Sequence, residues 1–71
     1  MAKEIKSHVT GTVWKVEVGV GDEVEENDDL IIIESMKMEM PVVAEEDCTV
    51  KEILCAEGDP VEEGKVLMIV E

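Results

Sequence analysis

The sequence lacks arginine, phenylalanine and tyrosine, and it contains a single tryptophan. Six lysines oppose 19 aspartates and glutamates, which gives a formal net charge of -13. Nucleic-acid binding needs clustered lysine and arginine to displace phosphate counterions, so this composition excludes a nucleic-acid partner. No run approaches the roughly 18 apolar residues of a membrane span, and no apolar segment follows the first methionine as in a signal peptide. We therefore expect a cytoplasmic protein that binds neither nucleic acid nor membrane.

Cysteine is scarce as well, with only Cys48 and Cys55. Seven residues of extended strand at roughly 3.3 Å each would separate them by about 23 Å, whereas a disulfide needs Cα atoms within about 7 Å. We expect both thiols to be reduced, with Cys55 acting as a small core residue. Two cysteines and the lone His8 lack the paired spacing of a metal site, and the acidic run 22–29 lacks the glycine placement of a calcium loop. No metal is expected.

The chain is nevertheless rich enough in β-branched and aliphatic residues to fold. Valine, isoleucine and leucine make up 21 of 71 residues, about 30%, whereas disordered chains typically have less than about 20% of such residues. A chain shorter than about 100 residues rarely holds two domains, so residues 1–71 are predicted to form one domain that is monomeric when isolated. The acidic surface favours solubility and suggests basic rims on its partners.

A repeat with a spacing of 37 residues organises the chain. Residues 12–34 align without a gap onto residues 49–71, and 10 of the 23 aligned pairs are identical. Two copies are too few for a solenoid, so we expect one domain made of two interlocking halves. Aligned apolar residues, such as Val24 with Val61 and Ile32 with Ile69, should be buried to similar extents as core residues. The identical pairs are Thr12/Thr49, Val13/Val50, Gly21/Gly58, Asp22/Asp59, Val24/Val61, Glu25/Glu62, Glu26/Glu63, Leu30/Leu67, Ile32/Ile69 and Glu34/Glu71.

Short strands separated by turns account for the local pattern. Alternation over residues 16–20 predicts a half-buried strand, and the apolar runs 30–33 and 66–70 predict two more. Gly21-Asp22, Asn27-Asp28, Gly58-Asp59 and Gly64 predict turns. About four strands per half, eight in all, indicate an all-β sandwich or barrel.

Lys37 occupies the connector between the halves, within Glu34-Ser35-Met36-Lys37-Met38. This segment resembles the attachment site of biotin carboxyl carrier domains, in which the lysine of a Met-Lys-Met triplet is biotinylated. Gly-Asp-x-Val follows at the family's spacing in both halves. The resemblance covers nearly the whole chain and fits the thumbless, single-domain type of the biotinyl/lipoyl attachment family.

The resemblance implies a flattened β-barrel or sandwich of two four-stranded antiparallel sheets with pseudo-twofold symmetry. In such domains the modified lysine lies at the tip of a tight hairpin, and the chain termini pair in the other sheet. The site would comprise Lys37, which carries covalent biotin, the flanks Met36 and Met38, and Glu34 and Ser35. A biotin protein ligase would attach the biotin. The loaded domain, itself a non-catalytic carrier, would carry a carboxyl group between biotin carboxylase and carboxyltransferase sites.

Local rules alone do not place a turn at Met36-Lys37, since neither residue favours a positive φ. Met36 and Met38 also have a plain structural interpretation, because residues two apart share one face of a strand and either could be core. Trp14 aligns with Lys51 and is expected to be partly buried. Cys48 stands where the matching Gly11 is usual, so the backbone of the two halves should differ there.

Two other functions remain open from the sequence. Lipoyl carriers share the fold but usually have Asp-Lys-Ala around the lysine, so lipoate is the alternative cofactor. An unmodified β-sandwich adaptor, whose acidic face binds a basic partner, is a further alternative. The chain is expected to be either a free-standing carrier or a domain of a larger carboxylase, and no residue identifies the acceptor substrate.

Overall fold

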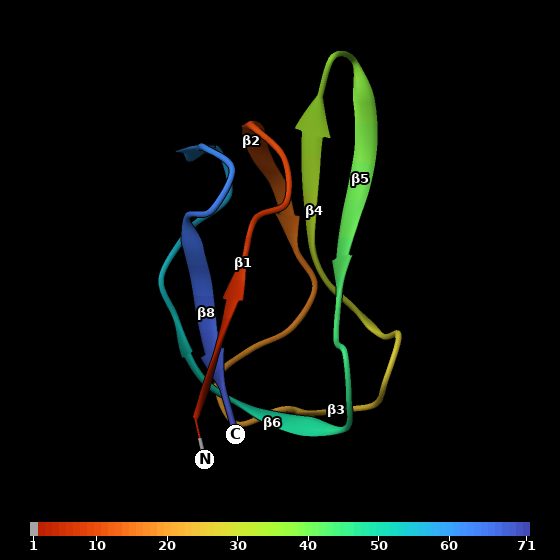
Figure 1. The fold of residues 1–71 in the computed structure, drawn as a ribbon, viewed down its shortest axis with the longest axis vertical. Coiled ribbons are helices and arrows are strands. Elements are labelled where there is room, and N and C mark those ends of the chain that lie inside the picture. Colours follow the sequence, from red (N-terminus) through yellow and green to blue (C-terminus); the bar gives the residue numbers. More distant parts are fainter. Residues whose placement is uncertain (1) are drawn as a thin grey trace.

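The computed structural model describes residues 2–71, so Met1 of the predicted domain lies outside the described residues. Residues 2–71 form eight strands and contain no helix, hence none long and apolar enough to cross a membrane (Figure 1). The strands are β1 (Lys3–Lys6), β2 (Gly11–Val16), β3 (Glu23–Val24), β4 (Asp29–Ser35), β5 (Met38–Val43), β6 (Cys48–Ile53), β7 (Pro60–Val61) and β8 (Val66–Val70).

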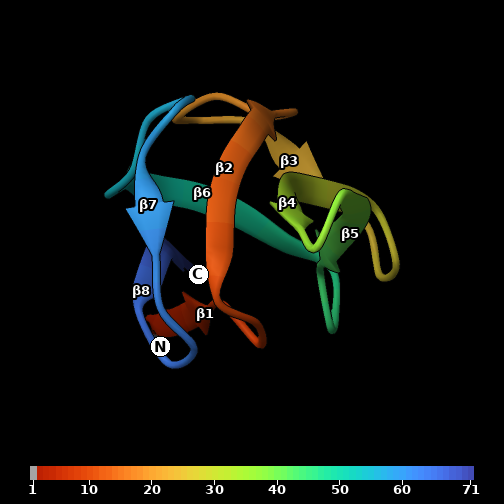
Figure 2. The same cartoon turned by 90° about the horizontal axis from the view of Figure 1, so that it is seen from above.

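Two four-stranded sheets, with strand orders β1-β8-β6-β3 and β5-β4-β2-β7, form the domain (Figure 2). Every strand pairing within them is antiparallel. Strands β1 and β8, near the two ends of the chain, pair in one sheet, and the hairpin β4–β5 lies in the other. The fold class expected from the sequence is confirmed.

The 37-residue offset maps one sheet onto the other. It carries β2 onto β6, β3 onto β7 and β4 onto β8, and it also carries β1 onto β5, a match that the sequence repeat does not reveal. The order β1-β8-β6-β3 thereby becomes β5-β4-β2-β7. Because β3 joins the sheet of the second half and β7 joins the sheet of the first, the two halves interlock.

Hydrogen bonds between backbone groups repeat with the same offset. The Gly21 amide donates to the Val50 carbonyl at 2.8 Å, and the equivalent Gly58 amide donates to the Val13 carbonyl at 2.7 Å. Such bonds join the turn of each half to the opposite sheet, so neither half can complete its hydrogen bonds alone. In a second equivalent pair of bonds the amides of Asn27 and Gly64 donate to the carbonyls of Ala44 and Ser7, both at 2.8 Å.

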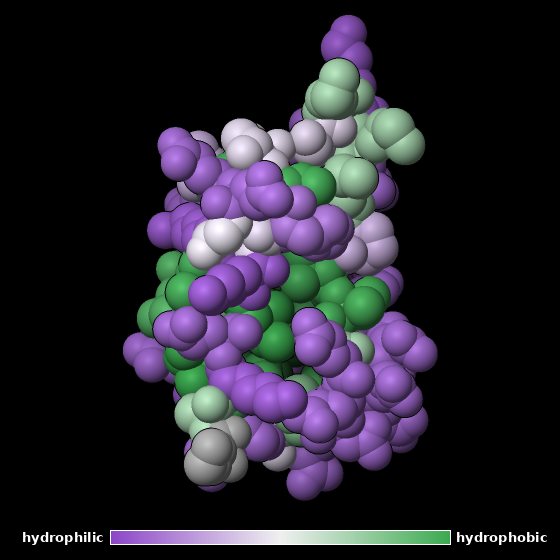
Figure 3. All heavy atoms as spheres, viewed as in Figure 1, coloured by the Kyte–Doolittle hydropathy of each residue, from purple (hydrophilic) through white to green (hydrophobic). Residues whose placement is uncertain are grey.

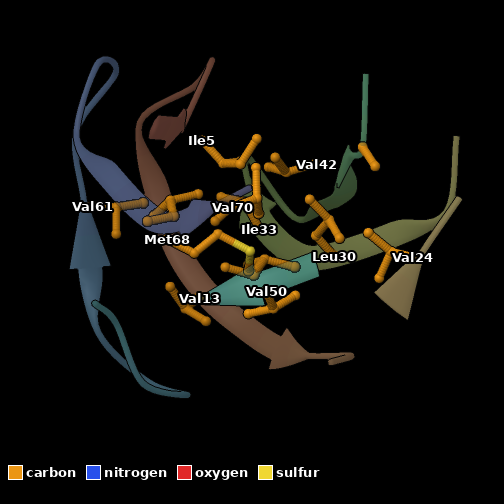
Figure 4. Packing of buried hydrophobic residues seen from close by; sticks show 13 residues of the cluster. Ile5, Val13, Val24, Leu30, Ile33, Val42, Val50, Val61, Met68 and Val70 are labelled. Atoms are coloured by element: carbon orange, nitrogen blue, oxygen red, sulfur yellow. The ribbon is translucent and has the colours of Figure 1, made fainter. Parts of the chain in front are cut away.

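The core lies between the sheets and draws on both halves (Figure 4). Leu30 and Leu67, identical in the repeat, are both completely buried. Val24 and Val61, on the short strands exchanged between the halves, are also buried, as expected. The buried apolar cluster is Ile5, Val13, Val24, Leu30, Ile31, Ile33, Val42, Ala44, Val50, Val61, Leu67, Met68 and Val70.

Ile32 and Ile69 are equivalent in burial but are not core residues. Both are only partly buried, so the expectation that they form part of the core is wrong. Successive side chains on a strand point to opposite faces, and the fully buried Ile31 and Ile33 occupy the inner face of β4. Ile32 therefore faces outward, and Ile69 follows it on β8.

The strand predicted over residues 16–20 is also misplaced, since β2 ends at Val16. A turn follows, in which the Asp22 carboxylate accepts a hydrogen bond from the Gly19 amide at 2.8 Å, and Gly21 takes a φ of 94°. Val20 is 65% exposed. The alternation at Val16 and Val18 reflects partial packing on the core rather than a strand. At the other expected turns, Asn27, Gly58 and Gly64 have positive φ.

The domain is elongated, with principal extents of 32 × 18 × 17 Å. The β4–β5 hairpin projects from one end of the long axis, and both chain ends lie at the other (Figure 1). An ion pair between Lys3 and Glu46 (2.5 Å) joins β1 to the segment after β5. Cys48 and Cys55 are free, as expected, and burial raises the pKa of both thiols above the usual 9.0.

Candidate functional site

A two-residue turn at Met36 and Lys37 joins β4 to β5. Ser35 pairs with Met38 in the β4–β5 register, which leaves Met36 and Lys37 as the central turn residues. Their φ angles are 54° and 62°. Positive φ at both central residues is what a type I′ hairpin turn requires, and its twist matches that of the flanking strands. The tight hairpin implied by the resemblance is present.

This turn holds two side chains in a conformation that neither favours. For residues other than glycine, asparagine and aspartate, the left-handed region costs roughly 1–2 kcal/mol per residue. The described backbone holds one other non-glycine residue at positive φ, Asn27, whose side chain tolerates it. Strained backbone that persists often marks a functional segment. The hairpin tip is therefore a candidate site on backbone geometry alone.

The methionines that flank the lysine face solvent. Met36 is 93% exposed and Met38 is 65% exposed, so the alternative in which either belongs to the core is excluded. Lys37 is exposed as well. Figure 3 shows the tip standing clear of the body, with the apolar methionine colour beside hydrophilic atoms. Large exposed apolar side chains flanking one amine make a surface suited to recognition by a partner.

Ser35 anchors the base of the hairpin to a neighbouring loop. Its hydroxyl donates a hydrogen bond to the Thr10 carbonyl at 2.8 Å, and the Thr10 hydroxyl accepts one from the Glu63 amide at 3.2 Å. In the other half Asp47 takes the place of Thr10 and accepts from the Glu26 amide. The Ser35 bond belongs only to the half that carries the lysine, and it restrains the hairpin where it leaves the body.

Gly11 lets the hairpin base approach β2 closely. A Cβ atom at Gly11 would lie 2.3 Å from the backbone carbonyl oxygen of Glu34 and 3.0 Å from the Ile33 side chain. Only glycine fits at that separation, since contacts to backbone below about 3 Å force the chain to move. Cys48 carries a Cβ at the equivalent position of the other half, so the expected difference between the halves is present there.

Two carboxylates lie behind the lysine. Glu34 and Glu39 are directly opposite each other in the β4–β5 register, and both are exposed. Like charges placed directly opposite on a sheet are destabilising. The lysine ion pairs in the part of the chain that the structure describes are made by Lys3, Lys6 and Lys15, so the amine of Lys37 there lacks a carboxylate within 4.0 Å. The tip thus presents one cation above an acidic base.

The site is a protruding amine rather than a pocket. Two of the larger hollows, of about 520 Å³ and about 510 Å³, are lined by residues other than 34–40, the first by acidic residues around β3 and β6. Among residues 2–71, no three histidine, cysteine or acidic side chains gather as metal ligands would. An exposed lysine on an ordered turn can accept an acyl group from an enzyme that encloses it, and it can hold that group away from the body.

All five residues predicted for the site, residues 34–38, lie together on this hairpin. Sequence reasoning missed Thr10, whose carbonyl anchors Ser35, because the repeat was aligned only from Thr12 onwards. Extending the same offset by two residues would have paired Thr10 with Asp47. The exposed side of Trp14 on the neighbouring strand β2 was expected only as partial burial, and it is 50% exposed.

Comparisons with known proteins agree with this geometry. A biotin/lipoyl family model, described as "Biotin-requiring enzyme", matches residues 1–70. The Biotin/lipoyl attachment protein of Bacillus subtilis is 45% identical over 64 residues, which cover 90% of this chain and 88% of that protein. The Biotinylated protein TB7.3 homolog of Mycobacterium leprae is 31% identical over 70 residues, 99% of each chain.

The solved structures include close matches to the fold. The crystal structure of the Kluyveromyces lactis urea carboxylase superposes on the whole chain with a TM-score of 0.94 and 42% identity. The chain covers only 6% of that carboxylase, whereas it spans most or all of the two short relatives.

Proposed function

The chain belongs to the biotin/lipoyl attachment family, and on that premise we propose that it is a biotin carboxyl carrier with Lys37 as the attachment residue. The observation that carries the proposal is the turn itself. It holds a lysine between two exposed methionines, in a left-handed backbone conformation, at the far tip of a projecting hairpin. Of the six lysines, Lys37 alone lies in a turn between paired strands.

The chain's own contribution to attachment is to present the amine. A lysine side chain ordinarily titrates near about 10.4, so it is mostly protonated near pH 7 and needs both deprotonation and an activated acyl donor. A ligase would supply both. Once Nζ has lost a proton, its lone pair attacks the activated carbonyl carbon of biotin, a C–N bond forms, and the activating group leaves with its bonding electrons. The resulting amide is neutral, and Nζ retains one hydrogen.

The residues around Lys37 fit a covalent tether and not an enclosing pocket. The tip is exposed on all the flanking residues 36–39, which leaves an attached group free to enter another protein's site. The biotin, once bound, supplies the carboxyl-carrying chemistry, while the protein supplies position. Ser35 and Gly11 hold the hairpin base, so the point of attachment is fixed relative to the body. A tethered group meets its second site at high effective concentration.

The partners we propose are a biotin carboxylase and a carboxyltransferase, as separate subunits or as domains of one enzyme. Relatives whose names point this way include a urea amidolyase, the human propionyl-CoA carboxylase alpha chain and the Staphylococcus aureus pyruvate carboxylase. In this scheme the domain acts as the carrier and the chemistry occurs in the partners' sites.

Lipoate is a second candidate, because the name of the Bacillus subtilis relative covers both cofactors. The exposed Met36 and Met38 favour biotin, since they form the Met-Lys-Met triplet that the resemblance associates with biotinylation. Lipoyl carriers usually have Asp and Ala at these positions.

Co-expression with a biotin protein ligase, and separately with a lipoate ligase, tests the proposal. Intact mass should show one biotinyl group in the first case and unmodified chain in the second. Peptide mapping should locate the biotin on Lys37, and Lys37→Arg, which keeps the charge, should remain unmodified. Label on Lys15 or Lys51, or labelling retained by Lys37→Arg, would contradict the assignment. Lipoylation without biotinylation would replace biotin by lipoate.

A further inference from the structure

An apolar strip crosses the outer face of the sheet that carries the lysine hairpin. Trp14 and Lys15 together face Ile32 at an irregularity in the β2–β4 register, and Ile32 faces Pro41 on β5. Two side chains opposite one partner at such a bulge point to the same side of the sheet. Trp14 and Val43 are 50% and 36% exposed, and Pro41 is exposed as well. The strip therefore consists of Trp14, Ile32, Pro41 and Val43.

The other sheet provides an internal control for this strip. The 37-residue offset places Lys51 at the position of Trp14, Glu4 at that of Pro41 and Lys6 at that of Val43, while Ile69 matches Ile32. The backbone is equivalent there, including the same irregularity, where Ile69 faces Glu52 and Glu4. Charged residues thus satisfy the fold at these outward positions. The apolar residues on the lysine-bearing sheet are not required by the architecture.

The composition makes this difference more pointed. Trp14 is the only aromatic residue of a chain with formal charge -13, and half of its surface faces solvent. Tryptophan is enriched among the residues that contribute most to protein–protein binding. An exposed apolar patch with charged residues around it is typical of an interaction site.

We propose that this strip is the docking surface for the biotin protein ligase that modifies Lys37, an inference that rests on the proposed function. The ligase must contact the hairpin, because the lysine amine is its substrate. Ile32 lies five residues from Lys37, or roughly 17 Å along the strand at about 3.3 Å per residue. A standard interface of about 800 Å² per partner has a radius of roughly 16 Å. Since the hairpin projects beyond the body, the remaining contact area must come from the strands behind it.

The charges around the strip identify the chemistry of the partner surface. Glu34 and Glu39 border it on the hairpin side, and Asp29 borders it beside Val43. Lys15, within the same face, is paired with Glu17 at 3.4 Å. The matching ligase surface is therefore an apolar patch rimmed by lysine and arginine. A second copy of this chain fits poorly, since it would bring the same carboxylates face to face in a molecule of charge -13.

The experiment measures biotinylation rates over a range of domain concentrations with purified ligase, ATP and biotin. Trp14→Lys and Pro41→Glu each copy the residue that the other sheet carries at the equivalent position. Trp14→Lys should raise KM for the domain about tenfold or more, Pro41→Glu should raise it severalfold, and kcat should stay within about twofold. Lys51→Glu, on the opposite sheet, is the matched control and should leave KM within about twofold. Urea melts followed by circular dichroism should show that all three variants fold.

Distinct outcomes overturn the inference and the function on which it rests. If wild type is biotinylated on Lys37 but KM is unchanged in both strip variants, the docking surface is wrong and the proposed function stands. If Lys51→Glu raises KM as much as Trp14→Lys, the effect is general electrostatics and the strip is not the surface. Sedimentation that shows a wild-type dimer broken by Trp14→Lys would assign the strip to a second copy. Wild type that the ligase does not modify would overturn the function itself.

Discussion

The two halves of the domain share strands, turns and cross-sheet hydrogen bonds, yet they differ at one connection. In the first half β4 continues through Met36 and Lys37 into β5. At the equivalent place in the second half the chain described here ends after β8, and β1 begins beside it (Figure 1). The lysine hairpin and the pair of chain ends are therefore symmetry equivalents at opposite ends of the long axis.

This difference separates what the fold needs from what the site needs. Positions that serve the architecture are matched between halves, as in Gly21 with Gly58, whose φ angles are both 94°. Features confined to the lysine half have no such counterpart: the left-handed Met36 and Lys37, the Ser35 hydrogen bond, the close approach at Gly11 and the exposed Trp14. The departures from symmetry thus map the functional end of the molecule, and each can be tested against its equivalent.

The largest expected effect tests whether the halves are energetically equivalent. Leu30→Ala and Leu67→Ala should each cost about 2–5 kcal/mol, because both side chains are fully buried and truncation leaves a cavity. A domain of this size has a total stability of only about 4–10 kcal/mol at roughly 0.05–0.15 kcal/mol per residue. Either variant should be marginal or unfolded in urea melts. The partly exposed Ile32→Ala and Ile69→Ala should cost clearly less, and a severe Leu30→Ala beside a silent Leu67→Ala would break the comparison.

A smaller effect should distinguish the two ends of the sheets. Gly11→Ala should cost about 1–3 kcal/mol and slow modification of Lys37, since its Cβ would meet the Glu34 carbonyl oxygen at 2.3 Å and push on the hairpin base. Cys48→Ala, the matched control, should change stability by less than about 1 kcal/mol because a Cβ is already present there. Urea midpoints and biotinylation rates report the two effects. Equal sensitivity at both positions would show that the close approach has no special role at the lysine end.

The smallest effect concerns the turn. Met36→Asn should stabilise the domain by up to about 1 kcal/mol, because asparagine tolerates positive φ better than methionine. The reciprocal change, Asn27→Met at φ 73°, should destabilise by a similar amount. Only Met36→Asn should impair biotinylation, because Asn27 lies in a turn at the far end of β4. A Met36→Asn variant that is less stable, or fully active, would show that the methionine is not kept at the cost of strain.

Much of the fold follows from the repeat and its turn chemistry. Glycine and asparagine at positions 21, 27, 58 and 64 predict positive φ, and the apolar runs predict β4 and β8. The match of β1 to β5 escaped detection because Lys3–Lys6 and Met40–Val43 share no residue type. The inner face of β4 was misassigned because four consecutive apolar residues carry no period, so nothing local distinguishes Ile31 and Ile33 from Ile32.

The candidate site was predictable only in part. Residues 34–38 were found through the family resemblance and not through local rules, which do not favour a turn at Met36-Lys37. Tertiary pairing of β4 with β5 imposes that turn on residues that disfavour it. The hydrogen bond from Ser35 to Thr10 joins residues 25 apart, and the outward strip depends on a bulge in the β2–β4 register. Such features arise from three-dimensional packing and leave no mark in local sequence.

The position of the chain ends has a mechanical consequence. Any polypeptide joined to this domain at either end is attached about 32 Å from the hairpin, the full long extent of the body. A stiff β-sandwich pivoting on such a joint behaves as a lever. It carries the lysine around an arc set by the body's own length before a flexible linker or the lysine side chain adds any reach. Two catalytic centres spaced further apart than a side chain can span could then be served by rotation about that joint.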